Sequence, residues 1–170
     1  DVTANYAQNK NALLGGSIDM NHNADMFSVD LKKGTMNQVT EVNKQNYAKI
    51  TPSKTELKMV KTTDGKEMGV WFVYPPDFDP NKKYPTLLYC QGGPQSALTQ
   101  FFSTRWSPAL MAAKGYIVVA PNRRGMPGWG TKWNEEISKD WGGQVMKDYL
   151  AATDYAKTLS YVDNDRMGAV

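Results

Sequence analysis

The sequence is poor in the two residue types that build most metal and redox sites in proteins. Its 170 residues include one cysteine, Cys90, and one histidine, His22. A single cysteine excludes an internal disulfide framework and any cysteine-rich metal site. The acidic residues supply no cluster with metal-ligand spacing either, so we expect neither a metal nor another cofactor.

Both residues have a structural interpretation. Cys90 ends an apolar run, so we predict a buried and unreactive thiol. His22 lies in the asparagine-rich segment Met20-Asn21-His22-Asn23. No nucleophile or carboxylate in that segment is placed to pair with it for base catalysis, so we interpret His22 as a solvated turn residue.

Long apolar runs and an excess of one charge are also missing. No stretch approaches the roughly 18 residues that a membrane-spanning helix needs, and the first residues lack the apolar core of a signal peptide. Lysine and arginine number 20 against 17 acidic residues, and they form no basic stripe. We therefore predict a globular protein with no membrane or nucleic-acid partner. Its compartment is left open, with a periplasmic or secreted location favoured over a cytoplasmic one.

Neither Gly-x-Gly-x-x-Gly nor Gly-x-x-x-x-Gly-Lys-Ser/Thr occurs in the sequence, which argues against a nucleotide site. The most informative stretch is residues 84–94, Tyr-Pro-Thr-Leu-Leu-Tyr-Cys-Gln-Gly-Gly-Pro. Thr86–Cys90 has the pattern of a strand buried on both faces of a parallel sheet. The glycine pair Gly92-Gly93 then predicts a turn whose backbone N–H groups a ligand can approach closely.

The segments that follow predict a βαβ unit. We expect a helix within Leu98–Lys114 and a second buried strand at Tyr116–Ala120. Ligands of such units bind at the carboxyl ends of the strands, which is where Gln91-Gly92-Gly93-Pro94 lies. A helix is expected at Val145–Leu159, with Val145, Tyr149, Ala152 and Ala156 on one stripe that faces the core. A turn at Tyr161–Asp165 and a third strand at Arg166–Val170 continue the pattern.

The segments before residue 84 are predicted to form antiparallel strands. Thr55–Thr63 and Glu67–Tyr74 flank Asp64-Gly65, a strong hairpin signal, and this hairpin is expected at the antiparallel edge of the main sheet. Residues 1–50 differ: we expect successive short strands there, as in one blade of a repeat array or the end of a β domain. These strands are Asn11–Ser17, Met26–Leu31 and Met36–Val42, followed by a polar linker at 43–53.

A loop rich in glycine and proline at 121–130 contains the adjacent residues Arg123 and Arg124. Two interpretations stand. The arginines can anchor the loop by pairing with a nearby acid, or they can bind a carboxylate of a substrate. The structural role is the favoured one of the two.

Residues 84–94 and the segments after them resemble the prolyl oligopeptidase family of serine peptidases, particularly its dipeptidyl-peptidase and acylaminoacyl-peptidase branch. The likeness covers nearly the whole chain. Residues 84–94 resemble the family's strand and oxyanion turn, and Gly115–Gly125 its next strand and Arg-Gly loop. Trp141-Gly142-Gly143 with Asp148-Tyr149 resembles the following helix, and Tyr161–Arg166 resembles the approach to the nucleophile strand.

The resemblance implies an α/β fold, with residues 51–170 as the N-terminal part of an α/β-hydrolase domain. Residues 11–43 are similar to the last blade of the β-propeller that caps this family's active site, so 1–50 are expected to end a propeller domain. Short peptides are the implied substrate, the remainder of the hydrolase domain is an implied partner, and a homodimer of the full-length protein is possible.

The resemblance also implies a mechanism and the residues that serve it. Gln91, Gly92 and Gly93 would form part of an oxyanion hole for a serine exopeptidase that works through an acyl-enzyme. The family usually has tyrosine or histidine at the position of Gln91, so a backbone N–H of Gly92 or Gly93 is the expected donor. Residues 166–170 resemble the family strand that leads into a Gly-x-Ser-x-Gly-Gly turn, and in the family the serine of this turn is the nucleophile.

We therefore expect this polypeptide alone to lack the catalytic triad, to be inactive and to be a fragment prone to aggregation. Two other interpretations remain. One is an esterase or lipase of the same fold, and the other is a non-catalytic truncated module that serves protein interaction.

Overall fold

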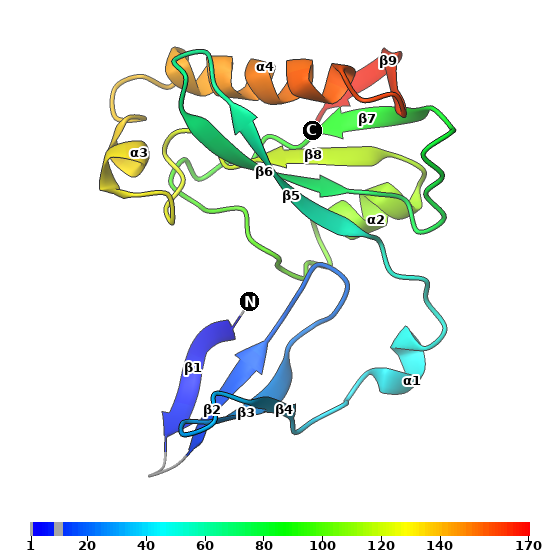
Figure 1. Cartoon of the computed structure of the whole chain (residues 1–170), viewed down its shortest axis with the longest axis vertical. Helices are drawn as coiled ribbons and strands as arrows, with labels where there is room; N and C mark the ends of the chain where they lie inside the picture. The colour runs from blue at the N-terminus through cyan, green and yellow to red at the C-terminus, as the bar shows by residue number, and fades with distance from the viewer. Residues whose placement is uncertain (1, 9–11) are drawn as a thin grey trace. The chain divides into compact units, whose positions relative to one another are not determined.

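The computed structural model describes residues 2–8 and 12–170 (Figure 1). The chain divides into two compact units. The first contains residues 1–52 and 99–107, and the second contains residues 53–98 and 108–170.

The first unit contains a four-stranded antiparallel sheet in the order β1-β2-β3-β4. The strands are β1 (Val2–Gln8), β2 (Ala12–Ser17), β3 (Asp25–Asp30) and β4 (Met36–Gln38). Strand β1 had no counterpart in the sequence prediction, and β4 ends four residues before the predicted limit at Val42. Short helix α1 (Lys44–Tyr47) lies within the segment that the sequence predicts as a linker.

The second unit is a mixed five-stranded sheet in the order β5-β6-β8-β7-β9. Strands β5 (Thr55–Lys61) and β6 (Glu67–Val73) pair antiparallel from Thr55 opposite Val73 to Lys61 opposite Glu67. Gly65 closes their turn with φ +81°, a backbone conformation that glycine adopts without strain. The predicted hairpin is confirmed, and so is its place at the antiparallel edge of the sheet.

The parallel part of the sheet consists of β8 (Ile117–Pro121), β7 (Tyr84–Leu88) and β9 (Val162–Ala169). Strand β7 lies between the other two and runs parallel to both, as the sequence predicts. Strand β9 begins inside the predicted turn at 161–165. The turn prediction was wrong there because Val162 is buried and pairs with Tyr84, and burial in a sheet outweighs the turn preference of the Asp and Asn residues that follow.

Helices cover both faces of this sheet (Figure 1). Helix α2 (Pro108–Ala113) connects β7 to β8, and α4 (Gln144–Lys157) connects β8 back across β7 to β9. Because the two connections run in opposite directions along the sheet, right-handed crossovers place the helices on opposite faces. Ala152 and Ala156 of α4 pack into the main core, which also contains Val70, Phe72 and Val119.

The predicted helix over 98–114 was too long, since only 108–113 are α-helical. The side-chain amide of Asn122 accepts from the Leu98 N–H and donates to the Leu98 carbonyl, at 2.9 and 3.0 Å. The Ser103 hydroxyl accepts hydrogen bonds from the backbone N–H groups of Arg105 and Trp106. These local bonds compete with helix formation, and Pro108 then suits the first helical position. A further short helix, α3 (Thr131–Glu135), was not predicted.

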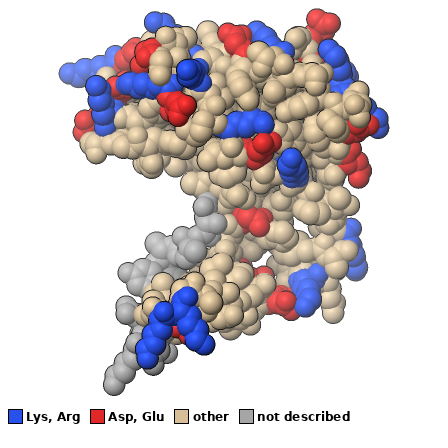
Figure 2. All heavy atoms as spheres, in the orientation of Figure 1, with Lys and Arg blue, Asp and Glu red and all other residues tan. Residues whose placement is uncertain are grey.

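Charged side chains of both signs lie interspersed on the face of the second unit seen in Figure 2. Within the part of the chain that the structure describes, no helix combines the length and apolarity needed to cross a lipid bilayer.

Candidate active site

The turn predicted as an oxyanion site begins where β7 ends. Tyr89 N–H donates to Val119 O on one side, at 2.8 Å, and Cys90 N–H donates to Val170 O on the other, at 2.7 Å. Val170 N–H in turn donates to Leu88 O at 2.9 Å. The turn therefore leaves the carboxyl edge of the parallel strands directly beside Val170, the arrangement that the sequence interpretation requires.

The two glycines of the turn are exposed, and their N–H groups are unengaged. Within residues 2–8 and 12–170, neither the Gly92 N–H nor the Gly93 N–H donates a hydrogen bond. Gly93 has φ +109°, and a Cβ there would lie 3.0 Å from the Cβ of Ser96. An L side chain at residue 93 would therefore strain the backbone and press on Ser96.

The Gln91 side chain is engaged inside the turn, where its amide nitrogen lies 3.4 Å from the Ser96 hydroxyl. Its backbone carbonyl accepts from Arg123 at 2.9 Å and from the Tyr149 hydroxyl at 3.3 Å. The side-chain amide of Gln91 thus contacts another residue of the turn, whereas the unengaged N–H donors of the turn belong to the backbone.

Arg123 lies against this turn and is only 3% exposed. Its guanidinium donates to Gln91 O, to Pro94 O at 2.7 Å and to Arg124 O at 2.7 Å. Its Nε donates to the Tyr149 hydroxyl at 3.1 Å. The partners of this buried cation are therefore backbone carbonyls and a tyrosine hydroxyl. The sequence had predicted an acidic side chain as the partner.

Tyr149 completes this arrangement from α4. The sequence places it on the apolar stripe of the helix, which predicts core packing, but its hydroxyl reaches the Gln91 carbonyl. Burial raises the pKa of Tyr149, against a smaller lowering effect of the neighbouring Arg123, so the hydroxyl keeps its proton at neutral pH. The sequence signal for this contact was a tyrosine on the buried stripe of a helix. Buried tyrosine hydroxyls usually have a hydrogen-bond partner, so a partner for Tyr149 could have been expected.

Arg124 is fully buried and binds three carboxylates from separate elements. It pairs with Asp64 of the β5–β6 turn, with Glu136 after α3 at 2.8 Å, and with Asp148 of α4 at 2.7 Å. Its guanidinium also lies 4.2 Å from the centre of the Trp133 ring. The fully buried acid Asp148 was not predicted, although its spacing on α4 matches the buried stripe.

The charges around Arg124 favour the ionised carboxylates. The Arg124 guanidinium holds the pKa of Asp64 well below its usual range, and hydrogen bonds from Lys66 and Arg124 lower the pKa of Glu136. These contacts support the anchoring interpretation for Arg124, as the turn contacts do for Arg123. The substrate-binding interpretation of the two arginines stays a prediction that no contact in the structure tests.

Cys90 corrects one expectation, because it is exposed and lies two residues beyond the end of β7. The strand ends earlier than predicted, so the thiol falls at the start of the turn. Partial desolvation raises the pKa of Cys90, against a smaller lowering by Arg123. The thiol is therefore protonated at neutral pH, which agrees with an unreactive cysteine.

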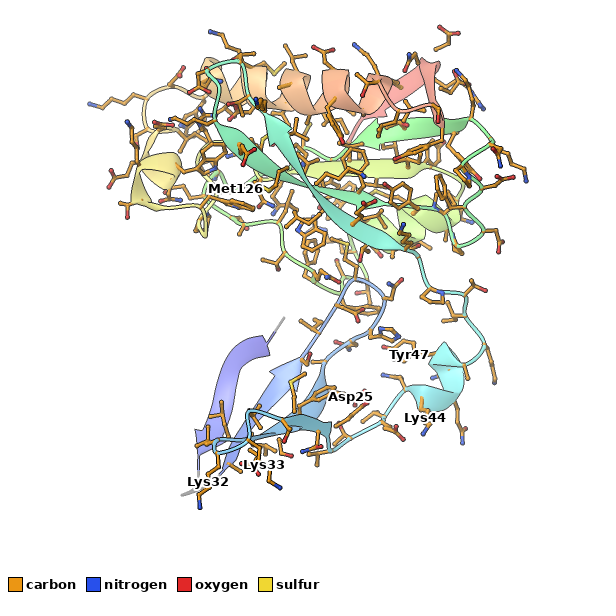
Figure 3. All side chains as sticks on the ribbon, in the orientation of Figure 1. Asp25, Lys32, Lys33, Lys44, Tyr47 and Met126 are labelled. Atoms are coloured by element: carbon orange, nitrogen blue, oxygen red, sulfur yellow. The ribbon has the colours of Figure 1, made fainter. Side chains whose placement is uncertain are left out.

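His22 is exposed as predicted, but it has a carboxylate partner that the sequence interpretation missed. Its Nδ1 lies 2.9 Å from Asp19, and its ring meets the Tyr47 ring edge-on at 4.8 Å. These residues line a pocket of about 430 Å³ in the first unit, together with Asp25 and Lys44 (Figure 3).

The charged side chains of this pocket contact polar groups of the same chain. Lys44 lies 2.7 Å from Glu41, and Asp25 accepts from the Thr40 hydroxyl at 2.7 Å. No group of three or more His, Cys, Asp and Glu residues that could hold a metal ion occurs in 2–8 and 12–170. The partners of Asp25 are uncharged groups, and these contacts do not identify a ligand for the pocket.

Comparisons with known proteins agree with this geometry. Residues 102–170 match the model of the prolyl oligopeptidase family. Over 146 residues the chain is 56% identical to dipeptidyl-peptidase 5 of Porphyromonas gingivalis, covering 86% of this chain and 21% of that protein. It is 51% identical to dipeptidyl-peptidase 5 of Porphyromonas endodontalis, with the same coverage of 86% and 21%.

Among solved structures, the acylaminoacyl peptidase of Pyrococcus horikoshii superposes with a TM-score of 0.84 at 21% identity, covering 98% of this chain and 26% of that one. This likeness confirms the α/β fold class. The chain spans about one fifth of the length of the curated relatives it matches. Residues 102–170, which include the parallel strands β8 and β9, therefore belong to the prolyl oligopeptidase family.

Proposed function

We propose that these residues form part of a serine exopeptidase that releases dipeptides from the amino terminus of short peptides. The relatives at 56% and 51% identity are named dipeptidyl-peptidases, which supports this substrate class over acylated amino acids. The observation that carries the proposal is the exposed pair of unengaged N–H groups at Gly92 and Gly93, beside the end of the central parallel strand.

The proposed role of the turn is to stabilise negative charge. A serine hydroxyl supplied by the rest of the protein attacks the peptide carbonyl carbon, and the carbonyl oxygen becomes an oxyanion. The N–H of Gly92 or Gly93 donates to that oxygen, together with an N–H next to the serine. The C–N bond then breaks, the amine leaves with a proton, and water hydrolyses the acyl-enzyme to regenerate the serine.

We also propose that the sheet β1–β4 is one blade of a β-propeller. Its four strands pair antiparallel in sequence order, which is the pattern of a propeller blade. A blade buries its faces only against neighbouring blades, so this proposal places the sheet in a longer protein. Access limited by such a propeller would explain a preference for short peptides.

The test uses the complete protein in which this sequence lies. It is assayed with dipeptidyl 4-nitroanilides, N-acetylaminoacyl 4-nitroanilides and 4-nitrophenyl esters, and labelled with a fluorophosphonate. We expect labelling of one serine and preferred cleavage of dipeptidyl anilides. Ester cleavage without anilide cleavage would instead identify an esterase, and the absence of labelling and turnover would identify a non-catalytic module.

A further inference from the structure

The carbonyl of Gln91 and the N–H of Gly92 belong to one peptide group. The described chain contains no cis peptide bond, so this group is planar and trans, and its C=O and N–H point in opposite directions. Whatever holds the Gln91 carbonyl therefore also sets the direction of the Gly92 N–H.

Two side chains from different elements hold that carbonyl. Arg123, after β8, donates to it at 2.9 Å, and Tyr149, on α4, donates to it at 3.3 Å. The Gly92 N–H thus points away from both donors, and it has no partner within residues 2–8 and 12–170. Glycine tolerates many backbone conformations, so a Gly-Gly turn without this restraint would allow the peptide group to rotate.

The same arginine holds the far end of the turn. Its Nη1 donates to Pro94 O at 2.7 Å, so one guanidinium bridges residues 91 and 94. Arg123 is 3% exposed and forms no ion pair with any described acidic residue. Burying a cation costs free energy unless its N–H groups form hydrogen bonds. Here the backbone carbonyls of the turn accept several of those hydrogen bonds.

We propose that Arg123 and Tyr149 are positioning residues that fix the Gln91–Gly92 peptide group and thereby hold the Gly92-Gly93 turn in the conformation that binds the oxyanion. The inference rests on the proposed function and assigns the side chains that orient its oxyanion turn. Hydrogen bonds to the carbonyl also polarise the peptide group, which strengthens the N–H at its other side as a donor.

The experiment compares two pairs of variants in the complete protein. Tyr149→Phe removes one hydroxyl from the turn, and Tyr155→Phe is its control on the same helix, where the Tyr155 ring packs on Phe72. Arg123→Met removes the bridging guanidinium, and Arg166→Met is its control at an exposed arginine that pairs with Asp163. Dipeptidyl anilide hydrolysis gives kcat and KM, and crystal structures give the direction of the Gln91–Gly92 peptide group.

We expect Arg123→Met to lower kcat about 10²-fold, the loss typical of one oxyanion donor, with KM changed less than threefold. Tyr149→Phe should lower kcat less, and both controls should keep wild-type kcat. The Gln91–Gly92 peptide group should be rotated or disordered in Arg123→Met. A folded Arg123→Met variant with wild-type kcat, or with the peptide group unchanged, would overturn the proposal.

Failure of the proposed function has a different signature. A wild-type protein that cleaves no peptide or anilide refutes that function. The structures of Arg123→Met and Tyr149→Phe still decide whether these side chains fix the peptide group, because this readout does not depend on turnover.

Discussion

At the scale of single residues, the neighbours Arg123 and Arg124 have separate roles. Arg123 binds backbone carbonyls at both ends of the candidate oxyanion turn. Arg124 points to three carboxylates and to the Trp133 ring. The sequence predicted an anchoring role for the pair, but it could not separate them, because partners 12 to 60 residues away along the chain decide each role.

Gly93 offers a residue-scale test of the turn. Gly93→Ala places a Cβ 3.0 Å from Ser96 Cβ at a backbone φ of +109°, so the turn must shift. We expect kcat for dipeptidyl anilides to fall roughly 10²- to 10³-fold, as for loss of an oxyanion donor.

The control for this variant is Gly128→Ala. Gly128 has a similar φ of +96°, but nothing lies within 4 Å of an added Cβ. Both variants should lose some stability, because alanine is strained at positive φ, and only Gly93→Ala should lose turnover. Equal kcat values in the two variants would remove the turn from catalysis.

At the scale of elements, what could be predicted from sequence depended on the range of the contacts. The β5–β6 hairpin and the parallel strands β7 and β8 were predictable because Asp64-Gly65 and short apolar runs are local signals. The helix expected over 98–114 failed because the Asn122 amide, 24 residues away, binds Leu98. The hydroxyl contact of Tyr149 with the turn was equally non-local.

Arg124 joins three elements, so its loss should destabilise the second unit. Arg124→Gln leaves Asp148, which is fully buried, without its cation. We expect the free energy of unfolding to fall by about 3–5 kcal/mol. Arg166→Gln, at an exposed ion pair with Asp163, should cost about 0–1 kcal/mol. Urea denaturation of the two variants measures this difference, and similar costs would contradict the proposed anchoring.

The same ion pairs predict sensitivity to acid. The pKa values of Asp64 and Glu136 are lower in the folded state than in the unfolded state. Their ionised carboxylates therefore contribute to folding stability at pH values above the unfolded-state pKa values, about 3.9 and 4.3. Stability should therefore fall as the pH drops below about 4. The double variant Asp64→Asn, Glu136→Gln should show a flatter profile of urea midpoint against pH between about 2.5 and 7. An unchanged slope would show that other groups cause the acid sensitivity.

At the scale of the whole molecule, the proposed function divides the chemistry between these 170 residues and the rest of a longer protein. The 170 residues include no Gly-x-Ser-x-Gly sequence, whereas the turn that would meet a nucleophile is fully formed beside Val170. We expect the isolated 170-residue polypeptide to be unlabelled by a fluorophosphonate, and the complete protein to be labelled once. Labelling of a serine within the isolated polypeptide would contradict this division.

The most direct measurement is a crystal structure of the complete protein with a dipeptidyl phosphonate bound to its reactive serine. We predict that the phosphonyl oxygen lies about 2.7–3.1 Å from the Gly92 or the Gly93 nitrogen. The Gln91 carbonyl should still accept from Arg123 and Tyr149 on the opposite side of the peptide group. A phosphonyl oxygen bound only by donors outside this turn, with the N–H groups of Gly92 and Gly93 facing bulk solvent, would contradict this prediction.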